Sequence, residues 1–251
     1  MSAVCCECRV LSQEVLAQDI RLLAVEWTDT AHLPHAGQFY MLRSWGADEA
    51  PFLSRPISVH AYENGRLEFL YQVKGQGTEK LARLTAGDTL KLTGPAGNGF
   101  DVAACAGKKI AVVGGGIGTA PLYQLCRELA KAGNKADFFA GYRDLPYALE
   151  PFEGVCGKVA FSTDSGKAGH HGFVTDLFEA GDYDLILTCG PEIMMKNVAK
   201  KAAAAGVECL VSLEKKMACG IGACLGCTCH TKEGPKSVCK NGPVFNAKEV
   251  F

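Results

Sequence analysis

The first hundred residues alternate between apolar and polar positions over short stretches, and turn residues separate those stretches. EVLAQDIRLLAVEW and GQFYMLRS have the pattern of strands, and so does AGDTLKLTGPAGNGF before its Gly/Pro loop. SVHAYENGRLEFLYQV has the pattern of a hairpin, with Asn64 and Gly65 supplying the positive φ angles of a tight turn. One short helix is predicted here, Thr78–Leu84. Residues 1–103 are therefore predicted to form a small antiparallel β barrel.

The pattern changes near Lys108. KKIAVVGGGIGTAPLYQLCRELAKAG combines a buried strand, a glycine turn and an amphipathic helix that ends at Gly133. The strands KADFFAGYR, KVAFSTD and YDLILTCG follow, then a helix with Pro191 in its first turn and the strand GVECLVS. Strands that alternate with helices predict a doubly wound parallel α/β domain over residues 104–211. Cysteine, glycine and loop residues dominate residues 212–251, which we expect to form a small separate region.

Composition excludes several classes of function. The net charge of −1 does not favour a nucleic-acid or acidic-lipid partner. No apolar run approaches the roughly 20 residues that cross a bilayer. The first residues, MSAVCCECRVLSQEV, do not have the basic and apolar regions of a secretory signal. These features predict a soluble cytoplasmic protein, a compartment in which thirteen cysteines favour metal or redox chemistry over disulfides.

Five of the thirteen cysteines are concentrated in the last forty residues. Cys219, Cys224 and Cys227 are spaced C-x4-C-x2-C, and Cys239 follows them, which is the ligand pattern of a plant-type 2Fe-2S cluster. The glycines between them let the chain wrap closely around a cluster. Structural zinc remains the alternative, although zinc favours paired C-x2-C units and only one such unit is present. A Rieske centre needs two histidines, and only His230 is local.

The other cysteines are predicted to be non-ligands. Cys229 lies too close to Cys227 to share the cluster without strain, and it can begin a strand that points away from it. Cys5, Cys6 and Cys8 lie in a predicted strand without a matching ligand cluster, so we expect structural thiols there. We expect four more to be buried as small apolar side chains: Cys105, Cys126, Cys156 and Cys209.

Three shorter motifs precede the cysteine region, and each is weak alone. Arg55 in RPISVH could be a surface cation, and Pro56 could mark a strand end. GGGIGT has the strand–turn–helix context of a phosphate loop, but Thr119 replaces the last glycine of the dinucleotide fingerprint. The next strand also does not end in an acidic residue that could hold a ribose, so the loop could simply pack helix on strand. The third motif, CGP at Cys189, ends a strand at the edge that faces the ligand crevice.

The order of barrel, GGGIGT loop and CGP resembles the ferredoxin-reductase family, whose barrel binds FAD and whose α/β domain binds a pyridine nucleotide. The resemblance implies that Arg55 pairs with phosphate as a fixed cationic fork and that Ser58 bonds near the flavin N5. The implied FAD residues are Arg55, Pro56, Ile57, Ser58, Leu70, Tyr71, Gln72, Gly77 and Thr78, the last two opening the short helix toward the pyrophosphate. The implied NAD residues are Gly114, Gly115, Gly116, Gly118, Cys189, Gly190 and Pro191.

The whole chain resembles a narrower family. SLEKKMACGIGACLGCTCH…VCKNGPVF, with RPIS and GQGTEKL, is similar to the electron-transfer subunits of NAD-dependent, type B dihydroorotate dehydrogenases. This resemblance implies FAD, a 2Fe-2S cluster and a partner, the FMN-containing catalytic subunit, in a heterotetramer of two of each. Electrons would pass from that FMN through the cluster and FAD to NAD+, in pyrimidine biosynthesis, without a catalytic acid or base from this chain. The alternatives are a flavin subunit of a sulfhydrogenase or of a ferredoxin-dependent NADP reductase complex, or a zinc-bearing interaction protein.

Overall fold

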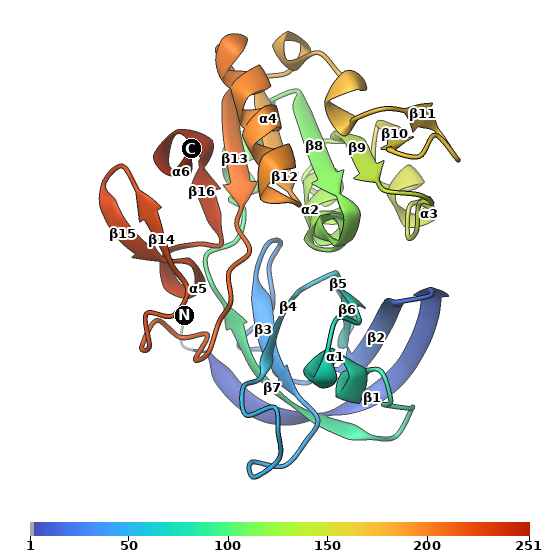
Figure 1. The fold of residues 1–251 in the computed structure, drawn as a ribbon, viewed down its shortest axis with the longest axis vertical. Helices are drawn as coiled ribbons and strands as arrows, with labels where there is room; N and C mark the ends of the chain where they lie inside the picture. The colour runs from blue at the N-terminus through green and yellow to red at the C-terminus, as the bar shows by residue number, and fades with distance from the viewer. Residues whose placement is uncertain (1–2) are drawn as a thin grey trace.

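The first sheet is antiparallel and curls into a half barrel (Figure 1). The computed structural model describes residues 3–251. The strand order is β4-β3-β7-β1-β2-β6-β5. The bounds are β1 Val4–Ala17, β2 Ile20–Glu26, β3 Phe39–Arg43, β4 Arg55–Ser58, β5 Ala61–Glu63, β6 Arg66–Gln72 and β7 Thr89–Ala96.

Strand β1 makes the curl possible. Its first half, Val4–Arg9, pairs with β7, and its second half, from Val10, pairs with β2, with bulges in that second half. Bulges bend a strand and increase its twist, so one long strand serves both halves of the sheet. Asn64 and Gly65, at φ 48° and 82°, form the predicted tight turn between β5 and β6. The antiparallel barrel predicted from the alternation is confirmed.

The predicted helix is present but shifted toward the N-terminus. Helix α1 runs from Gln76 to Leu81 rather than from Thr78 to Leu84. The Thr78 hydroxyl accepts the backbone N–H of Lys74 at 2.9 Å, so Thr78 closes the turn that precedes the helix instead of beginning it. Leu81 is fully buried in the barrel core, which fixes the helix against the strands.

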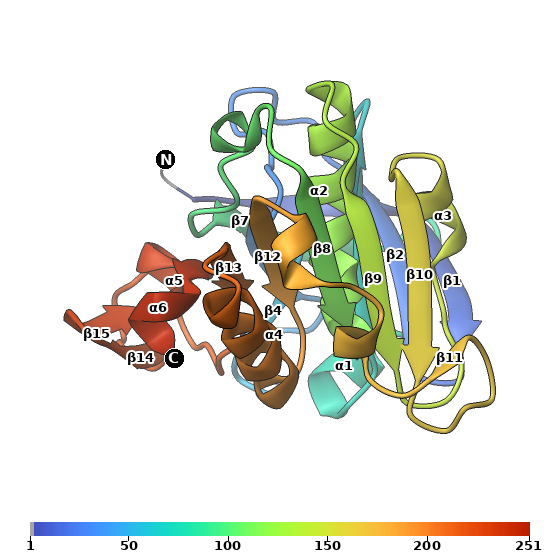
Figure 2. The ribbon, with the colours of Figure 1, turned by 90° about the horizontal axis from the view of Figure 1, so that it is seen from above.

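The second sheet is parallel from β8 to β13, with strand order β11-β10-β9-β8-β12-β13-β16 (Figure 2). Its strands are β8 Ile110–Gly115, β9 Asp137–Tyr142, β10 Lys158–Thr163, β11 His170–His171, β12 Leu185–Cys189 and β13 Glu208–Ser212. Helices α2 Ala120–Lys131 and α3 Glu150–Glu153 pack on one face, and α4 Glu192–Ala204 packs on the other. The predicted doubly wound architecture is confirmed, and its switch point lies between β8 and β12.

Helix α2 also joins the two sheets. The Gln124 side chain accepts the Tyr62 N–H at 2.9 Å, and Arg127 pairs with Glu63 at 2.7 Å. His60 is buried, and its Nδ1 lies 2.8 Å from the Ala120 carbonyl at the helix start. Burial lowers the pKa of His60, which keeps this contact neutral. The α/β unit is therefore held firmly on the barrel, and the cleft between them has a defined shape.

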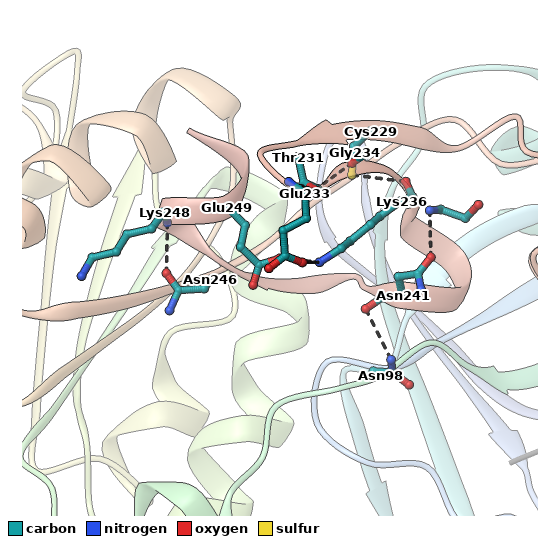
Figure 3. Close-up of polar contacts among 11 residues, drawn as sticks. Asn98, Cys229, Thr231, Glu233, Gly234, Lys236, Asn241, Asn246, Lys248 and Glu249 are labelled. Carbon is teal, nitrogen blue, oxygen red and sulfur yellow. Dashed lines mark hydrogen bonds and ion pairs between the residues drawn. The ribbon is translucent and has the colours of Figure 1, made fainter.

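The cysteine-rich tail adds a strand to the second sheet and contacts the loop that follows β7 of the barrel. It contains the hairpin β14 Thr228–Thr231 and β15 Gly234–Ser237, helix α5 Val238–Asn241, strand β16 Val244–Asn246 and helix α6 Ala247–Val250. Strand β16 pairs antiparallel with β13 at the sheet edge. Asn98 of the barrel donates to the Asn241 carbonyl at 3.3 Å (Figure 3). Three residues are too few to show a strand period, which is why β16 was not predicted.

Candidate functional site

A cavity opens between the barrel strands β4 and β6 and the start of α2. Ile117, Ala120 and Cys189 line it from the α/β side. Six of the residues implied for FAD line it from the barrel side: Pro56, Ile57, Ser58, Leu70, Tyr71 and Gln72. The Tyr71 hydroxyl accepts from the Gln13 side chain at 3.0 Å, so the phenol itself is anchored inside the barrel. Residues from RPIS and LYQ, distant in sequence, thus meet on one wall.

Arg55 and Gly77 meet beside this cavity. A Cβ on Gly77 would lie 2.4 Å from Arg55 Nε, so the guanidinium lies directly on the first turn of α1. Arg55 Nη1 also donates to the Leu53 carbonyl at 2.5 Å, and the guanidinium stands 5.8 Å from the centre of the Trp45 ring. A fixed guanidinium over the free amides of a helix start suits a diphosphate. The fit is specific to glycine at position 77, because any side chain there would displace the guanidinium.

A second cavity, of about 640 Å³, lies against the glycine loop, and its size is that of a small-molecule site. Five residues implied for NAD line it: Gly115, Gly116, Gly118, Gly190 and Pro191. A Cβ on Gly118 would lie 2.5 Å from the Gly190 Cα, so the two loops touch backbone to backbone. Two implied residues lie elsewhere. Cys189 lines the first cavity, and Gly114 packs β8 against Thr119 and Leu122.

The two cavities form one cleft with a shared wall. Six residues line both: Gln72, Lys74, Ile117, Leu213, Glu214 and Lys215. Lys74, Glu214 and Lys215 were not predicted from the sequence. Glu214 and Lys215 follow the C-terminal end of β13, where ligand crevices form in parallel sheets, and that position was the available signal.

The tail closes the far side of the second cavity. Thr228, Cys229 and His230 of β14 line it, together with Val250 and Phe251. These residues were also not predicted, because they lie more than a hundred residues from the glycine loop in sequence. The region that carries the cysteine motif therefore also shapes the nucleotide-sized cavity.

A neighbouring cavity extends the glycine loop toward β10. Gly115 and Gly116 line it, with Arg143 after β9 and Asp164 after β10. Strand β9, the next strand along the chain, does not end in an acidic residue that could hold a ribose. Asp164 provides a carboxylate one strand further along the sheet, at the same carboxyl edge.

The four cysteines predicted as metal ligands come together in two pairs. The Cys224 N–H points at Cys219 Sγ at 3.4 Å, and the Cys224 thiol contributes to lowering the pKa of Cys219. The Cys239 N–H points at Cys227 Sγ at 3.4 Å, and the Cys227 thiol contributes to raising the pKa of Cys239. Across residues 3–251, no three His, Cys, Asp or Glu side chains meet around one point that could hold a single metal ion. Two pairs suit a cluster of two irons, each of which takes two protein ligands.

Backbone amides surround the sulfurs. The N–H groups of Ile221, Gly222 and Gly226 point at cysteine sulfurs at 3.1–3.5 Å. Burial raises the pKa of Cys219, but the Ile221 and Cys224 amides and the Cys224 thiol outweigh it and lower this pKa to about 6. Burial and the Cys227 thiol raise the pKa of Cys239 to about 12, against the Gly222 amide. Amides converging on sulfur stabilise the thiolate form that binds iron.

Cys229 lies in β14, in the register of the hairpin. Its Sγ donates to the Lys236 carbonyl across the hairpin at 3.4 Å, and its side chain is buried (Figure 3). Burial raises its pKa, against the nearby charge of Lys215. Lys236 in turn pairs with Glu233 and Glu249, both at 2.8 Å. The thiol is thus engaged in the hairpin, in agreement with its predicted strand position.

Most of the remaining cysteines are at least partly buried, whereas Cys5 of β1 is exposed. Cys6 and Cys8 lie on one face of β1 with their sulfurs 3.7 Å apart, and Cys8 is buried in the barrel core. Burial raises the pKa of Cys8 to about 12, which keeps it a thiol. Cys105, Cys126, Cys156 and Cys209 are all buried, as expected.

The cysteine loop lies directly against the wall of the first cavity. A Cβ on Gly220 would lie 2.6 Å from the Met41 side chain of β3. Phe39, two residues earlier on the same strand, lines the first cavity, and so does Met217, two residues before Cys219. Phe39, Met41, Cys227 and Cys239 share one apolar cluster. Only packed side chains therefore separate the cysteine loop from the first cavity.

Comparison with known proteins agrees with this arrangement. Residues 214–251 match the model of the iron-sulfur cluster binding domain of dihydroorotate dehydrogenase B. The chain is 48% identical to the dihydroorotate dehydrogenase B (NAD(+)) electron transfer subunit of Clostridium acetobutylicum, over 86% of this chain and 85% of that one. It is 41% identical to the same subunit of Caldanaerobacter subterraneus subsp. tengcongensis, over 97% of both chains.

Solved structures give the same fold. An NADH-dependent reduced ferredoxin-NADP oxidoreductase matches with a TM-score of 0.83 and 28% identity, over 97% of this chain and 89% of that one. A ferredoxin reductase of carbazole 1,9a-dioxygenase matches with a TM-score of 0.68 and 21% identity, over 82% and 67% of the chains, which shows the fold alone. Because the identity to curated relatives exceeds 40% along almost the whole chain, this protein belongs to the family of dihydroorotate dehydrogenase B (NAD(+)) electron transfer subunits.

Proposed function

We propose that this chain carries electrons from the FMN of a dihydroorotate-oxidising catalytic subunit, through a 2Fe-2S cluster and FAD, to NAD+. The observation that carries the proposal is the continuity of the site. The cysteine loop packs on Met41 through Gly220, beside the wall of one cavity, and that cavity shares six residues with a second one. The reaction is dihydroorotate + NAD+ to orotate + NADH + H+, a step of pyrimidine biosynthesis, in the cytoplasm. In residues 3–251, no helix is long and apolar enough to cross a bilayer.

Each of the three parts of the chain is proposed to bind one cofactor or substrate. The barrel, residues 1–103, would hold FAD, with Arg55 and Gly77 at the diphosphate and Ser58 at the ring. The α/β unit, residues 104–211, would hold NAD+ against Gly116 and Gly118. Residues 212–251 would hold the cluster by Cys219, Cys224, Cys227 and Cys239. A flavin supplies the exchange between one-electron and two-electron carriers.

The adenosine end of the nucleotide would extend into the cavity beside Arg143 and Asp164. A carboxylate there accepts hydrogen bonds from ribose hydroxyls and repels a 2′-phosphate. Asp164 therefore supports NAD+ over NADP+. Arg143 on the same rim is the residue through which NADP+ could bind if Asp164 were removed.

The catalytic partner is proposed to dock where the cluster loop is most exposed, in an assembly of two subunits of each kind. Cys224 is exposed, and Ile221 and Leu225 on either side of it expose 58% and 65% of their surface. Leu225 also has φ 58°, a left-handed conformation that a leucine rarely adopts. An apolar side chain held outward at such a cost is typical of a functional contact.

The decisive experiment purifies the chain with a dihydroorotate dehydrogenase catalytic subunit under anaerobic conditions. The complex should show flavin bands and a broad iron-sulfur absorbance, and it should reduce NAD+ with dihydroorotate. A colourless protein with bound zinc would refute the proposal. Electron transfer with ferredoxin but not with dihydroorotate would instead indicate a ferredoxin-dependent reductase, the activity named for the solved neighbour.

Two cysteine variants test the ligand set. Cys224→Ser should lose the cluster, because one iron would keep a single thiolate. Cys229→Ser should retain it, because that thiol bonds to the Lys236 carbonyl across the hairpin. Iron and sulfide analysis with electron paramagnetic resonance of the reduced protein measures both. An intact cluster in Cys224→Ser would contradict the assignment.

A further inference from the structure

We propose that Glu214 delivers and accepts the proton that accompanies each NAD+ reduction. The inference rests on the proposed function, in which electrons reach the cleft one at a time through a cluster. Electrons that arrive in this way bring no hydrogen. The balance in the cleft is NAD+ + 2 e− + H+ to NADH. One proton per turnover must therefore come from water, and in the reverse direction one proton must leave.

The position of Glu214 suits this task. The wall shared by the two cavities contains three ionisable side chains, Lys74, Glu214 and Lys215. Glu214 is the one carboxyl among them, and a carboxyl can give up and regain a proton near neutral pH, whereas amines hold theirs. The shared wall borders the proposed binding sites of both the flavin and the nicotinamide, so Glu214 lies close to both groups. Glu214 is also exposed to the water of the cleft, from which it can be reprotonated.

The surroundings of Glu214 favour its protonated form. Although water reaches it, protein encloses it closely enough that burial raises its pKa, and the Lys74 charge only partly offsets this. Burial raises the pKa of the Cys189 thiol at the end of β12, and the negative charge of Glu214 raises it further. The other charged groups facing the cleft are Lys215 on the same segment, His230 of β14 and Glu192 of α4. The raised pKa extends the range of pH over which Glu214 can donate.

The protonation state of Glu214 should make the rates of both directions depend on pH. In NAD+ reduction Glu214 must be protonated, so the rate should fall as pH rises through its pKa. In the reverse direction a proton must leave when the NADH-reduced protein gives up its electrons, so Glu214 must be ionised for that step, and the rate of that oxidation should fall as pH drops through the same pKa. Lys74 lowers this pKa. Lys74→Met should therefore move both limits to higher pH, an effect that a purely structural role of Glu214 would not produce.

The experiment separates proton movement from hydride transfer in the holoprotein by stopped flow. Bleaching of the flavin by NADH moves a hydride and needs no solvent proton, so Glu214→Gln should keep this rate within about twofold. Oxidation of the NADH-reduced protein by ferricyanide must release the proton, and Glu214→Gln should slow it at least tenfold, about 1.4 kcal/mol. Glu150→Gln, an exposed carboxamide variant on α3, is the control for both rates.

A second readout does not depend on turnover. The infrared difference between wild type and Glu214→Gln should contain a carboxyl band with a pKa above the ordinary glutamate value. This pKa should be higher still in Lys74→Met. Glu214→Asp keeps the carboxyl and should retain part of the wild-type ferricyanide rate. It takes the place of Glu214→Gln if that variant does not fold. The proposal is overturned if Glu214→Gln oxidises at the wild-type rate with the wild-type pH profile, or if the band titrates at an ordinary pKa. A wild-type protein that NADH does not bleach would refute the proposed function instead.

Discussion

Replacement of Gly118 by alanine tests whether contact between two loops shapes the nucleotide cavity. The added methyl group would lie 2.5 Å from Gly190 Cα and 2.6 Å from both Gly190 N and the Cys189 carbonyl oxygen. Ordinary contact begins at 3.4 Å, so the loops would have to separate by about 0.9 Å. The obstructing atoms are backbone atoms, which cannot turn aside as the end of a flexible side chain can.

The expected cost follows from overpacking, about 1–3 kcal/mol. For a chain of this size, each kcal/mol lowers Tm by roughly 2–4 °C. Because Gly118 and Gly190 both line the second cavity, the displacement should also weaken NADH binding, by about tenfold or more for 1.4 kcal/mol. FAD content should change less than NADH affinity, because the loops border the first cavity at Ile117 and Cys189 but the barrel wall is not touched.

The assay combines thermal unfolding with NADH titration of the purified holoprotein. Gly181→Ala is the matched control, since a Cβ there would meet no atom within 4 Å and its φ is not in the left-handed region. The control also removes the general effect of alanine on the unfolded chain. If Gly118→Ala keeps both the Tm and the NADH Kd of wild type, the loop contact does not shape the nucleotide site.

Two further substitutions address the other sites. Gly77→Ala should weaken FAD binding about tenfold, the loss of about one charge-assisted hydrogen bond, because its methyl group would lie 2.4 Å from Arg55 Nε and displace the guanidinium. Its Tm without FAD should change little, and an unchanged FAD Kd in a fluorescence titration would contradict the placement of Arg55 at the diphosphate. The double variant Ile221→Ser and Leu225→Ser should keep the cluster signal and NADH-driven flavin reduction but weaken binding of the catalytic subunit at least tenfold by titration calorimetry. Wild-type affinity would exclude this loop as the docking surface.

The barrel and the parallel sheet could be predicted because their signals are local. Alternation over seven or eight residues, the Asn64–Gly65 turn and the apolar strand before GGGIGT each specify an element within a short window. The cysteine spacing is equally local, since Cys219, Cys224 and Cys227 lie within nine residues of one another. Cys239 is more distant, yet a short hairpin and one helical turn return it to Cys227.

The shared wall of the cleft could not be predicted, because it is assembled from three distant segments. Lys74 follows β6, Glu214 follows β13, and Ile117 lies in the glycine loop. In the sequence LEKK, Glu214 and Lys215 look like an ordinary pair of solvated charges. Only the folded sheet shows that they lie at the crevice. Asp164 was not predicted either, because it follows β10 and not the strand next to the glycine loop in sequence, although the carboxyl ends of all parallel strands meet at one edge.

The position of the tail explains how one chain can keep two redox sites at a fixed spacing. Strand β3 carries Phe39 on the wall of the first cavity and Met41 under Gly220 of the cysteine loop. On the other side, β16 extends the parallel sheet and β14 closes the nucleotide cavity. The loop is thus fixed to both units, and a change in its position would alter the walls of the first and second cavities together. A flexible tether could not hold a one-electron carrier against a cavity wall in this way, because ordering such a segment costs about 1–2 kcal/mol per residue in backbone entropy. Here the sheet hydrogen bonds and the apolar cluster of Phe39, Met41 and Cys227 offset that cost during folding, before any cofactor is reduced.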